Sequence, residues 1–381
     1  MKTKLFYILP IFISVLTFTS CKNDLDVLAP GEESVSVYGV LNPNLPVQNI
    51  RINKVYLTDG DALEVAQDAS QINYGPGELK VTLQRFMNGS TTPTLTTVGN
   101  STKKEIVLTE TVVATASGNF STEQRLWQTT DKLYTSGEYK LVIKNIISGK
   151  EFTAQSLMID SVKSYNTMPF IFVPITYPVH CGAGNAGYVA PTIPGTGTQP
   201  NAYINYNVLT QSKKISFKSV ANAKLYKVTM RFHYIDSLMD GVTGIRNYVD
   251  LNFPSLTSNT TAGNEDLSVS FEVKDFYTLL ATEIPKKTTG SIRHRTAHFM
   301  EYIVYACSEN MNTFLQVNEP STTIAQDKPN YTNIVGGTGI FASTSKTSLG
   351  KELKDEFIDE LSNNPITTSL GFIKRYKFIC P

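Results

Sequence analysis

Residues 133–143 read LYTSGEYKLVI, a turn followed by a run in which polar and apolar side chains alternate. Gly137 suits the turn, and Tyr139 stands at the start of the alternating run. An apolar period of two is typical of a strand that buries one face. This stretch therefore predicts a strand in a sheet with one buried and one solvated face.

Runs of the same kind lie on both sides of this stretch. They are residues 35–41, 48–57, 79–86, 105–113, 118–127 and 151–157. Tyr139 also resembles the tyrosine corner of immunoglobulin-type sandwiches, in which the phenol reaches an upstream backbone group. About seven short strands in this span predict an immunoglobulin-like β-sandwich over residues 35–158.

The chain after residue 158 predicts a second β-rich domain, residues 159–381. Strands are expected at residues 203–209, 213–217, 224–235, 248–253, 267–273 and 293–306. Helical spacing predicts one short helix over 276–283, with Asp275 as its cap, and another over 308–317, capped by Ser308. The fold class is therefore mainly β, with one or two short helices.

Residues 1–20 have the three parts of an export signal: two lysines, an apolar run too short for a comfortable membrane span, and small residues before Cys21. The sequence Phe18-Thr19-Ser20-Cys21 resembles the lipobox of bacterial lipoproteins, in which a thiol at the first mature position receives diacylglycerol. We expect cleavage after residue 20 and lipidation of Cys21, so that its acyl chains, diacylglycerol and palmitate, anchor the protein. The alternative is an ordinary secretory signal with an accidental cysteine.

Residues 21–34 predict a flexible tether between the lipid and the first strand. The stretch Lys22-Asn23-Asp24-Leu25-Asp26 resembles the surface-export tag of Bacteroidota lipoproteins. It can also be a plain solvated leash. The expected location is the outer membrane, lipid-anchored and facing the cell surface.

The charge balance argues against nucleic acid as a partner. The chain has 34 basic and 33 acidic residues and a net charge of +1, without a basic run. Binding to a phosphate backbone needs a concentrated positive surface. We expect no nucleic-acid partner.

Four cysteines limit the disulfide chemistry. Lipidation uses Cys21, which leaves Cys181, Cys307 and Cys380 in an oxidising compartment. At most one disulfide can form among the three, and the sequence does not rank the pairings. Cys307 lies in an apolar run and can also be a buried thiol.

Catalytic and metal-binding patterns are weak in this sequence. His294 and His298 are four residues apart, but the surrounding pattern is that of a strand and no third ligand is evident. The glycines of 333–341 (NIVGGTGIF) lack the following helix and lysine of a phosphate cradle, so we interpret them as a turn where two backbones pass closely. We predict no catalytic residues, no metal and no cofactor, and hence no enzyme.

A stretch rich in proline, glycine and aromatic residues, 169–198, contains the candidate binding residues. They are Phe170, Phe172, Tyr177 and Tyr188. Aromatic side chains on loops can stack on a glycan or contact a peptide. They can equally cover an open sheet edge.

Three stretches together resemble a known family. The first is Cys21–Asp26 with the strand Val37–Asn42 that follows, and the second is Leu133–Leu141 with Lys150–Ala154. The third is the segment Asn333-Ile334-Val335-Gly336-Gly337-Thr338-Gly339-Ile340-Phe341. They resemble the Bacteroidota outer-membrane lipoproteins of unknown function that are often encoded beside TonB-dependent receptors. The resemblance implies an N-terminal immunoglobulin-like sandwich, a second β-rich domain and tethering to the outer membrane, and it implies no reaction.

These observations lead to one expected function and two alternatives. We expect a non-catalytic binding or accessory subunit of a TonB-dependent uptake system, which contacts the receptor or a peptide or glycan ligand. The first alternative is a surface adhesion or structural module. The second is a hydrolase whose site is assembled from distant residues.

Overall fold

The computed structural model describes residues 33–55, 66–87, 89–98, 101–114, 123–162, 206–238, 244–286, 292–318 and 331–373. Strands dominate these residues and helices are few, which confirms the mainly β fold class. Three strands begin and end at the predicted residues: β1 (Val35–Leu41), β3 (Leu79–Phe86) and β10 (Glu151–Leu157).

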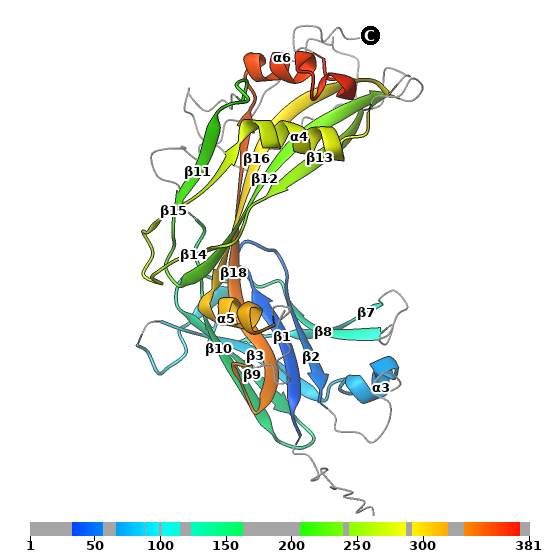
Figure 1. Cartoon of the computed structure of the whole chain (residues 1–381). Helices are drawn as coiled ribbons and strands as arrows, with labels where there is room; N and C mark the ends of the chain where they lie inside the picture. The colour runs from blue at the N-terminus through cyan, green and yellow to red at the C-terminus, as the bar shows by residue number, and fades with distance from the viewer. Residues whose placement is uncertain are drawn as a thin grey trace, which may run out of the picture.

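The largest sheet runs along the length of the molecule (Figure 1). Its strands follow the order β13-β12-β16-β18-β1-β2-β8-β7, and β14 pairs with β12. The bounds not yet given are β2 (Gln48–Lys54), β7 (Thr109–Ala114), β8 (Glu123–Thr129), β12 (Ala223–Leu238), β13 (Gly244–Asn252), β14 (Leu256–Thr257), β16 (Ile292–Ser308) and β18 (Gly337–Glu352). The predicted central strand over 293–306 is β16, with β12 on one side and β18 on the other.

Strand β18 connects the two halves of the molecule. Its first part, residues 337–343, pairs in parallel with β1, and its second part, residues 344–352, pairs antiparallel with β16. Chain far beyond residue 158 therefore completes the sheet of the N-terminal half. The division into folding units at residue 158 stays a prediction.

The N-terminal half closes its core with a second sheet of order β17-β10-β9-β3-β6. The further strands are β6 (Ile106–Val107), β9 (Glu138–Asn145) and β17 (Ile334–Val335). Alternating side chains of both sheets, such as Val37, Ile50, Leu141 and Phe152, meet in an aliphatic core that also buries Trp127. Each strand contributes every second residue because successive side chains point to opposite faces.

The turn before β9 contains the hydrogen bond expected of Tyr139. The backbone N–H of Tyr134 donates to the phenolic oxygen of Tyr139 over 3.1 Å. Burial raises the pKa of this phenol. The upstream contact is therefore confirmed, whereas the immunoglobulin-like strand arrangement stays a prediction.

The glycine motif lets two backbones approach closely, as interpreted from the sequence. A Cβ on Gly339 would lie 2.0 Å from the carbonyl oxygen of Val37, and the φ of Gly339 is +101°. A Cβ on Gly337 would lie 2.5 Å from the carbonyl oxygen of Val35. Only glycine fits where β18 pairs with β1 in this way.

The C-terminal half packs helices and a small sheet onto the large one. The small sheet pairs β11 (Ser212–Lys218) with β15 (Asp266–Glu272), and the helices are α4 (Val273–Glu283) and α6 (Asp355–Asn363). The inner face of β12 was predicted correctly, because Val228, Met230 and Phe232 are buried there. This core is rich in aromatic rings that pack edge to face.

Two sets of buried polar side chains in the C-terminal half are paired. Arg295 donates to Asp236 over 2.6 Å and to the carbonyl oxygens of Leu370 and Pro285, which ties the last described segment to β16. The hydroxyl groups of Tyr206 and Tyr302 lie 2.6 Å apart in the core. Burial raises the pKa of Tyr206 to about 12.

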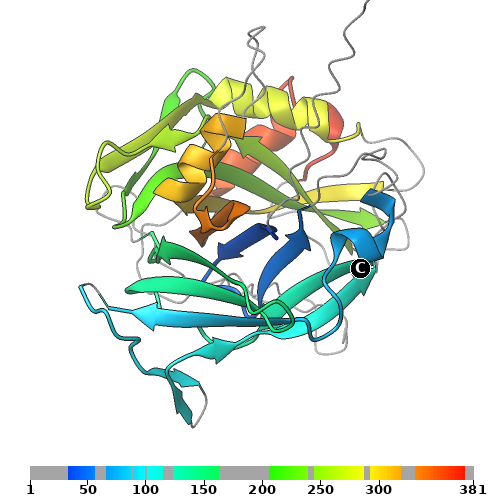
Figure 2. The same cartoon turned by 90° about the horizontal axis from the view of Figure 1, so that it is seen from below.

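The remaining elements lie around the two cores. They are α3 (Ala69–Ile72), β4 (Thr96–Val98), β5 (Ser101–Lys103), α5 (Glu309–Asn318) and η1 (Thr368–Leu370). Viewed from below, α4 and α5, in yellow and orange, lie on one side of the molecule, opposite the cyan strands of the N-terminal half (Figure 2). Among the described residues, no helix combines the length and apolar character needed to cross a bilayer.

Two local predictions were wrong, and a third ended too early. The described part of the expected strand 203–209, from residue 206 onward, forms no strand. Helix α4 begins at Val273, with Glu272 as its N-cap, so Asp275 lies in the first turn instead of capping it. The expected strand over 118–127 corresponds to β8, which continues to Thr129, and its expected start lies outside the described residues.

Candidate functional site

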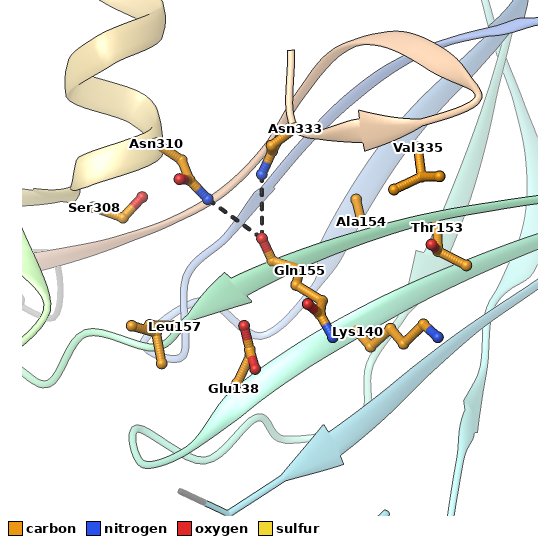
Figure 3. A pocket seen from close by; sticks show the side chains of 10 residues that line it. All are labelled: Glu138, Lys140, Thr153, Ala154, Gln155, Leu157, Ser308, Asn310, Asn333 and Val335. Carbon is orange, nitrogen blue, oxygen red and sulfur yellow. Dashed lines mark hydrogen bonds between the residues drawn. The ribbon is translucent and has the colours of Figure 1, made fainter. Parts of the chain in front are cut away.

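A groove of about 510 Å³ lies on the outer face of the N-terminal half, beside β10 (Figure 3). Outward-facing side chains of β9 and β10 form one side, and the start of α5 and the residues around β17 form the other. The lining residues are Glu138, Lys140, Thr153, Ala154, Gln155, Leu157, Ser308, Asn310, Asn333 and Val335.

Strand alternation decides which side chains line this groove. Tyr139 and Leu141 point into the core and are fully buried, so Glu138 and Lys140 point outward on the same strand. The antiparallel register places Lys140 opposite Gln155. The groove therefore lies on the wet face of the strand pair whose other face forms the core.

Two asparagines hold the opposite side of the groove in place. The Nδ2 atoms of Asn333 and Asn310 both donate to the carbonyl oxygen of Gln155, over 3.1 and 3.3 Å (Figure 3). Asn333 also donates to the carbonyl oxygen of Phe341 over 2.6 Å and accepts from its N–H over 2.9 Å. The asparagine of the NIVGGTGIF motif thus fastens β18 to the edge of β10.

The chemistry of the groove suits recognition of an uncharged polar or peptide segment. It holds one carboxylate, one ammonium group and several amide and hydroxyl groups. Val335 is 68% exposed and Leu157 is 44% exposed, so apolar contact area is available beside these polar groups. Apolar side chains rimmed by polar ones are typical of protein interaction sites.

A second cluster lies on the open face of the large sheet in the C-terminal half. We call it the polar face and define it as Arg231, His233, Tyr248, Asp250, Glu301 and Ser348. Arg231 binds Asp250 through two hydrogen bonds, of 2.7 and 2.8 Å, and its guanidinium lies 3.9 Å from the centre of the Tyr248 ring. The strands β12, β13, β16 and β18 each contribute to it.

The polar face brings a serine, a histidine and a carboxylate together. The Nε2 of His233 lies 2.8 Å from the carboxylate of Glu301, and the hydroxyl of Ser348 donates to the same carboxylate. Burial alone would raise the pKa of Glu301, but the hydrogen bonds from His233 and Ser348 outweigh it and lower the pKa.

This arrangement does not activate a nucleophile. In an acyl-transfer triad the histidine lies between the hydroxyl and the acid and removes the proton from the hydroxyl. Here Glu301 lies between Ser348 and His233, and its lowered pKa makes it a weak base. The cluster therefore connects four neighbouring strands across the surface of the sheet.

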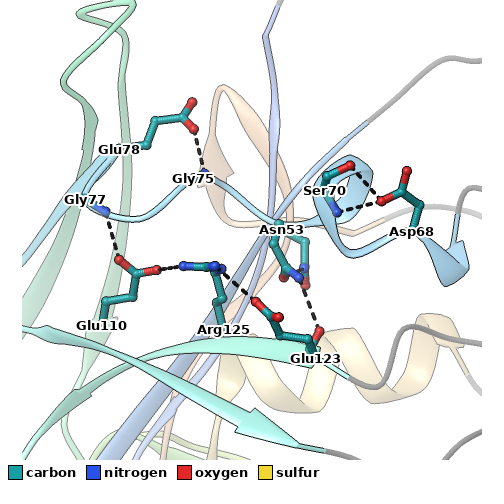
Figure 4. A network of polar contacts seen from close by, with 10 residues as sticks. Asn53, Asp68, Ser70, Gly75, Gly77, Glu78, Glu110, Glu123 and Arg125 are labelled. Carbon is teal, nitrogen blue, oxygen red and sulfur yellow. Dashed lines mark hydrogen bonds and ion pairs between the residues drawn. The ribbon is translucent and has the colours of Figure 1, made fainter.

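A third polar network connects β7 and β8 to the segment before β3 (Figure 4). Arg125 pairs with Glu110 and, over 3.0 Å, with Glu123. Glu110 in turn accepts from the backbone N–H of Gly77 over 3.0 Å. Arg125 is shared between two carboxylates, and each of these charged groups has a partner within the network, which identifies it as a structural connection.

Metal ligands do not gather in the part of the chain that the structure describes. No group of three or more histidine, cysteine, aspartate or glutamate side chains there could hold a metal ion. His294 and His298 both lie on β16.

The site residues predicted from sequence lie outside the described residues. This applies to Cys21, the lipidation site, and to the binding candidates Phe170, Phe172, Tyr177 and Tyr188. Their roles stay predictions.

One of the three cysteines considered for a disulfide is described. Cys307 is a buried free thiol, and burial raises its pKa to about 11. A thiol with so high a pKa is a poor nucleophile and behaves as a small apolar group. Cys181 and Cys380 lie outside the described residues.

The groove and the polar face were not predicted as sites. The alternation in 224–235 correctly placed Arg231 and His233 on the outward side of a strand, which was a partial signal for the polar face. Nothing in the sequence pattern indicated that Glu301 and Ser348 would lie next to them, because their approach depends on the pairing of β12 with β16 and of β16 with β18.

The sequence was compared with protein-family models and with curated proteins. No family model matches the sequence, and no curated protein matches it.

Proposed function

We propose that this protein is an outer-membrane lipoprotein that works as a non-catalytic binding subunit of a TonB-dependent uptake system. The acyl chains on Cys21 hold it at the membrane, and the groove beside β10 contacts the receptor or its ligand. The family resemblance in the sequence supplies the link to the receptor. Facing the cell surface is part of the same proposal.

The exposed apolar pair at the groove is the observation that carries the binding role. Val335 and Leu157 remain in water although they flank a concave, amide-rich surface. Burying such side chains against a partner contributes about 25 cal/mol per Å² of apolar area. The amides of Asn310 and Asn333 are already bonded to Gln155, so the groove is preformed and loses little entropy on binding.

The catalytic alternative has less support. The serine, histidine and carboxylate that meet on the polar face have the wrong order for nucleophile activation. The adhesion alternative differs from the proposal only in the partner, because it does not involve a TonB-dependent receptor. Co-purification of the protein with such a receptor therefore separates the two.

The test is isolation of the lipoprotein from detergent-solubilised outer membranes. We expect a TonB-dependent β-barrel receptor in stoichiometric amount with the parent chain. The double variant Val335→Glu/Leu157→Glu should lose most of that receptor, because it places two charges where apolar contact is needed.

A matched control is the double variant Val107→Glu/Val112→Glu, which changes two exposed valines on other strands. It should retain the receptor. Equal recovery of the receptor with both double variants would show that the groove is not the contact. Absence of any barrel from the parent preparation, with the protein still accessible to protease on whole cells, would favour adhesion instead.

A further inference from the structure

The turn between β9 and β10 presents two isoleucines to solvent. Ile146 is 61% exposed and Ile147 is 81% exposed. Turns favour glycine, asparagine, aspartate, proline and serine, and the turn geometry here needs no large apolar side chain at either position. We call Ile146 and Ile147 the apolar tip.

The turn that carries the apolar tip is held rigidly. The side-chain oxygen of Asn145 accepts from the backbone N–H of Ile147 over 2.8 Å and of Ser148 over 3.2 Å. Backbone hydrogen bonds from Gly149 to Asn145 and from Asn145 to Lys150, each 2.9 Å, close the turn. The tip is therefore preorganised, and contact with a partner need not order it first.

The chain enters the fold beside this turn. The carboxylate of Glu33, the first described residue, accepts from Asn145 Nδ2 over 2.7 Å and from Ser148 Oγ over 2.6 Å. Its carbonyl oxygen accepts from the Nζ of Lys150 over 2.6 Å. The start of β1 and the β9–β10 turn accordingly lie at the same end of the molecule (Figure 1).

The length of the tether limits how far this end can move from the lipid. About a dozen residues separate Cys21 from Glu33, and they span at most about 40 Å when fully extended. Because the lipid anchor keeps the tip within this distance of the bilayer, the effective concentration of the tip at the membrane surface is in the millimolar range. Even a weak contact between the tip and the membrane then forms.

We propose that the apolar tip inserts into the interface of the same membrane that holds Cys21. This inference rests on the proposed function, since it requires the lipid anchor. Val55 adds apolar surface at this end, because its N–H pairs with the carbonyl oxygen of Ser34 and its side chain is exposed. The lipid and the tip give two points of attachment.

Two points of attachment orient the molecule. The C-terminal half, with α6, lies at the far end from the turn (Figure 1). That half then projects away from the bilayer, while the N-terminal half and its groove lie nearer to the membrane surface, where a receptor is reached.

The test uses a tryptophan placed at the tip. The purified lipoprotein with Ile147→Trp is reconstituted into vesicles of phosphatidylethanolamine and phosphatidylglycerol, with or without bromine on the acyl chains. Bromine quenches tryptophan only at short range. The single native tryptophan, Trp127, is buried, so the parent chain measures a constant background.

We expect brominated lipid to remove more than about half of the added emission, as for a side chain at the boundary of headgroups and acyl chains. The control Val112→Trp places the probe at an exposed position on β7, at the edge of the large sheet. Its emission should not change with bromination.

Flotation of the same samples separates the two proposals. Protein that floats with the vesicles while the residue-147 probe stays unquenched retains the anchor and overturns the tip contact. Quenching of the residue-147 probe that only equals that of the residue-112 probe also overturns the tip contact. Shielding of the residue-147 probe from a water-soluble quencher only when a receptor is added assigns the tip to a protein partner and likewise overturns the membrane contact. Protein that does not float overturns the anchor and the tip contact together.

Discussion

The two halves of the molecule build their cores in different ways. The N-terminal half brings two sheets face to face and fills the space with aliphatic side chains of alternating strands, among them Val37, Ile50 and Leu141. The C-terminal half covers one face of the large sheet with helices and the small β11–β15 sheet, and it fills the space with aromatic rings. The first kind of core depends on local alternation, whereas the second depends on segments that meet only after folding.

The halves also differ in how they treat buried polar groups. In the N-terminal half, the phenol of Tyr139 bonds to the backbone five residues upstream. In the C-terminal half, Arg295 bonds to Asp236, Pro285 and Leu370, from three other segments. The contacts of Arg295 join segments that are distant in the chain, whereas the contact of Tyr139 is local, so the removal of the Arg295 side chain should have the larger effect.

The largest effect is expected for Arg295→Leu. It leaves Asp236 buried without its cation and removes the side-chain hydrogen bonds to the carbonyl oxygens of Pro285 and Leu370, so we expect a loss of about 3–5 kcal/mol. Hydrogen exchange should show lost protection in β12 and β16 first. The control Lys218→Met breaks an ion pair whose aspartate, Asp266, is exposed, and it should cost about 1 kcal/mol or less. Equal losses in the two variants would contradict a special role for Arg295.

The next largest effect is expected for Gly339→Ala, at about 3 kcal/mol. The new Cβ would meet the carbonyl of Val37, and the positive φ adds strain. Gly149→Ala is the matched control, because Gly149 also has positive φ but open space around it, and we expect about 1 kcal/mol there.

The Gly339 variant also tests whether the halves unfold together. Because β18 pairs with both β1 and β16, denaturant unfolding followed by Trp127 fluorescence and by exchange in β12 should shift by the same amount. A shift of the Trp127 transition alone would show that the two halves unfold as independent units, and it would contradict a connection through β18.

Smaller effects are expected from removing one phenolic hydroxyl in each core. Tyr302→Phe leaves the hydroxyl of Tyr206 buried without its partner, and we expect a loss of about 2 kcal/mol. Tyr139→Phe frees the N–H of Tyr134, an exposed residue that water can reach, and the loss should be about 1 kcal/mol. The double variant Tyr206→Phe/Tyr302→Phe should lose less than the sum of its single changes, as measured by denaturant unfolding.

The smallest effect is the pH dependence contributed by Glu301. Its folded pKa is lowered from the ordinary value of 4.5, so its contribution is present above that value and is lost as the pH falls through the folded pKa. Glu301→Gln should flatten the acid side of the stability curve by about 1 kcal/mol. The control Asp266→Asn changes an exposed carboxylate and should leave the curve as it is. A parent curve with no acid-side slope would contradict the assignment.

Local pattern predicted much of the fold but little of the candidate site. The strands 35–41, 79–86 and 151–157 were placed to the residue, because alternation reports which face of a strand is buried. Helix α4 was placed three residues late, because Val273 and Glu272 continue the alternation of β15 and hide the start of the helix. The strand predicted over 203–209 is absent in its described part, from residue 206 onward, where the ring of Tyr206 packs into the aromatic core from an irregular segment.

The sequence by itself determined the strand periods, the turn at Gly137 and the need for glycine in 336–339, and it predicts the lipid anchor at Cys21. Only the tertiary structure decided that β18 would pair with β1, that Asn333 would bond to the edge of β10, and that Glu33 would bond to Asn145 in the β9–β10 turn. The physical reason is that a period or a turn depends on neighbours in the chain, whereas the choice of a pairing strand depends on packing and loop closure across hundreds of residues.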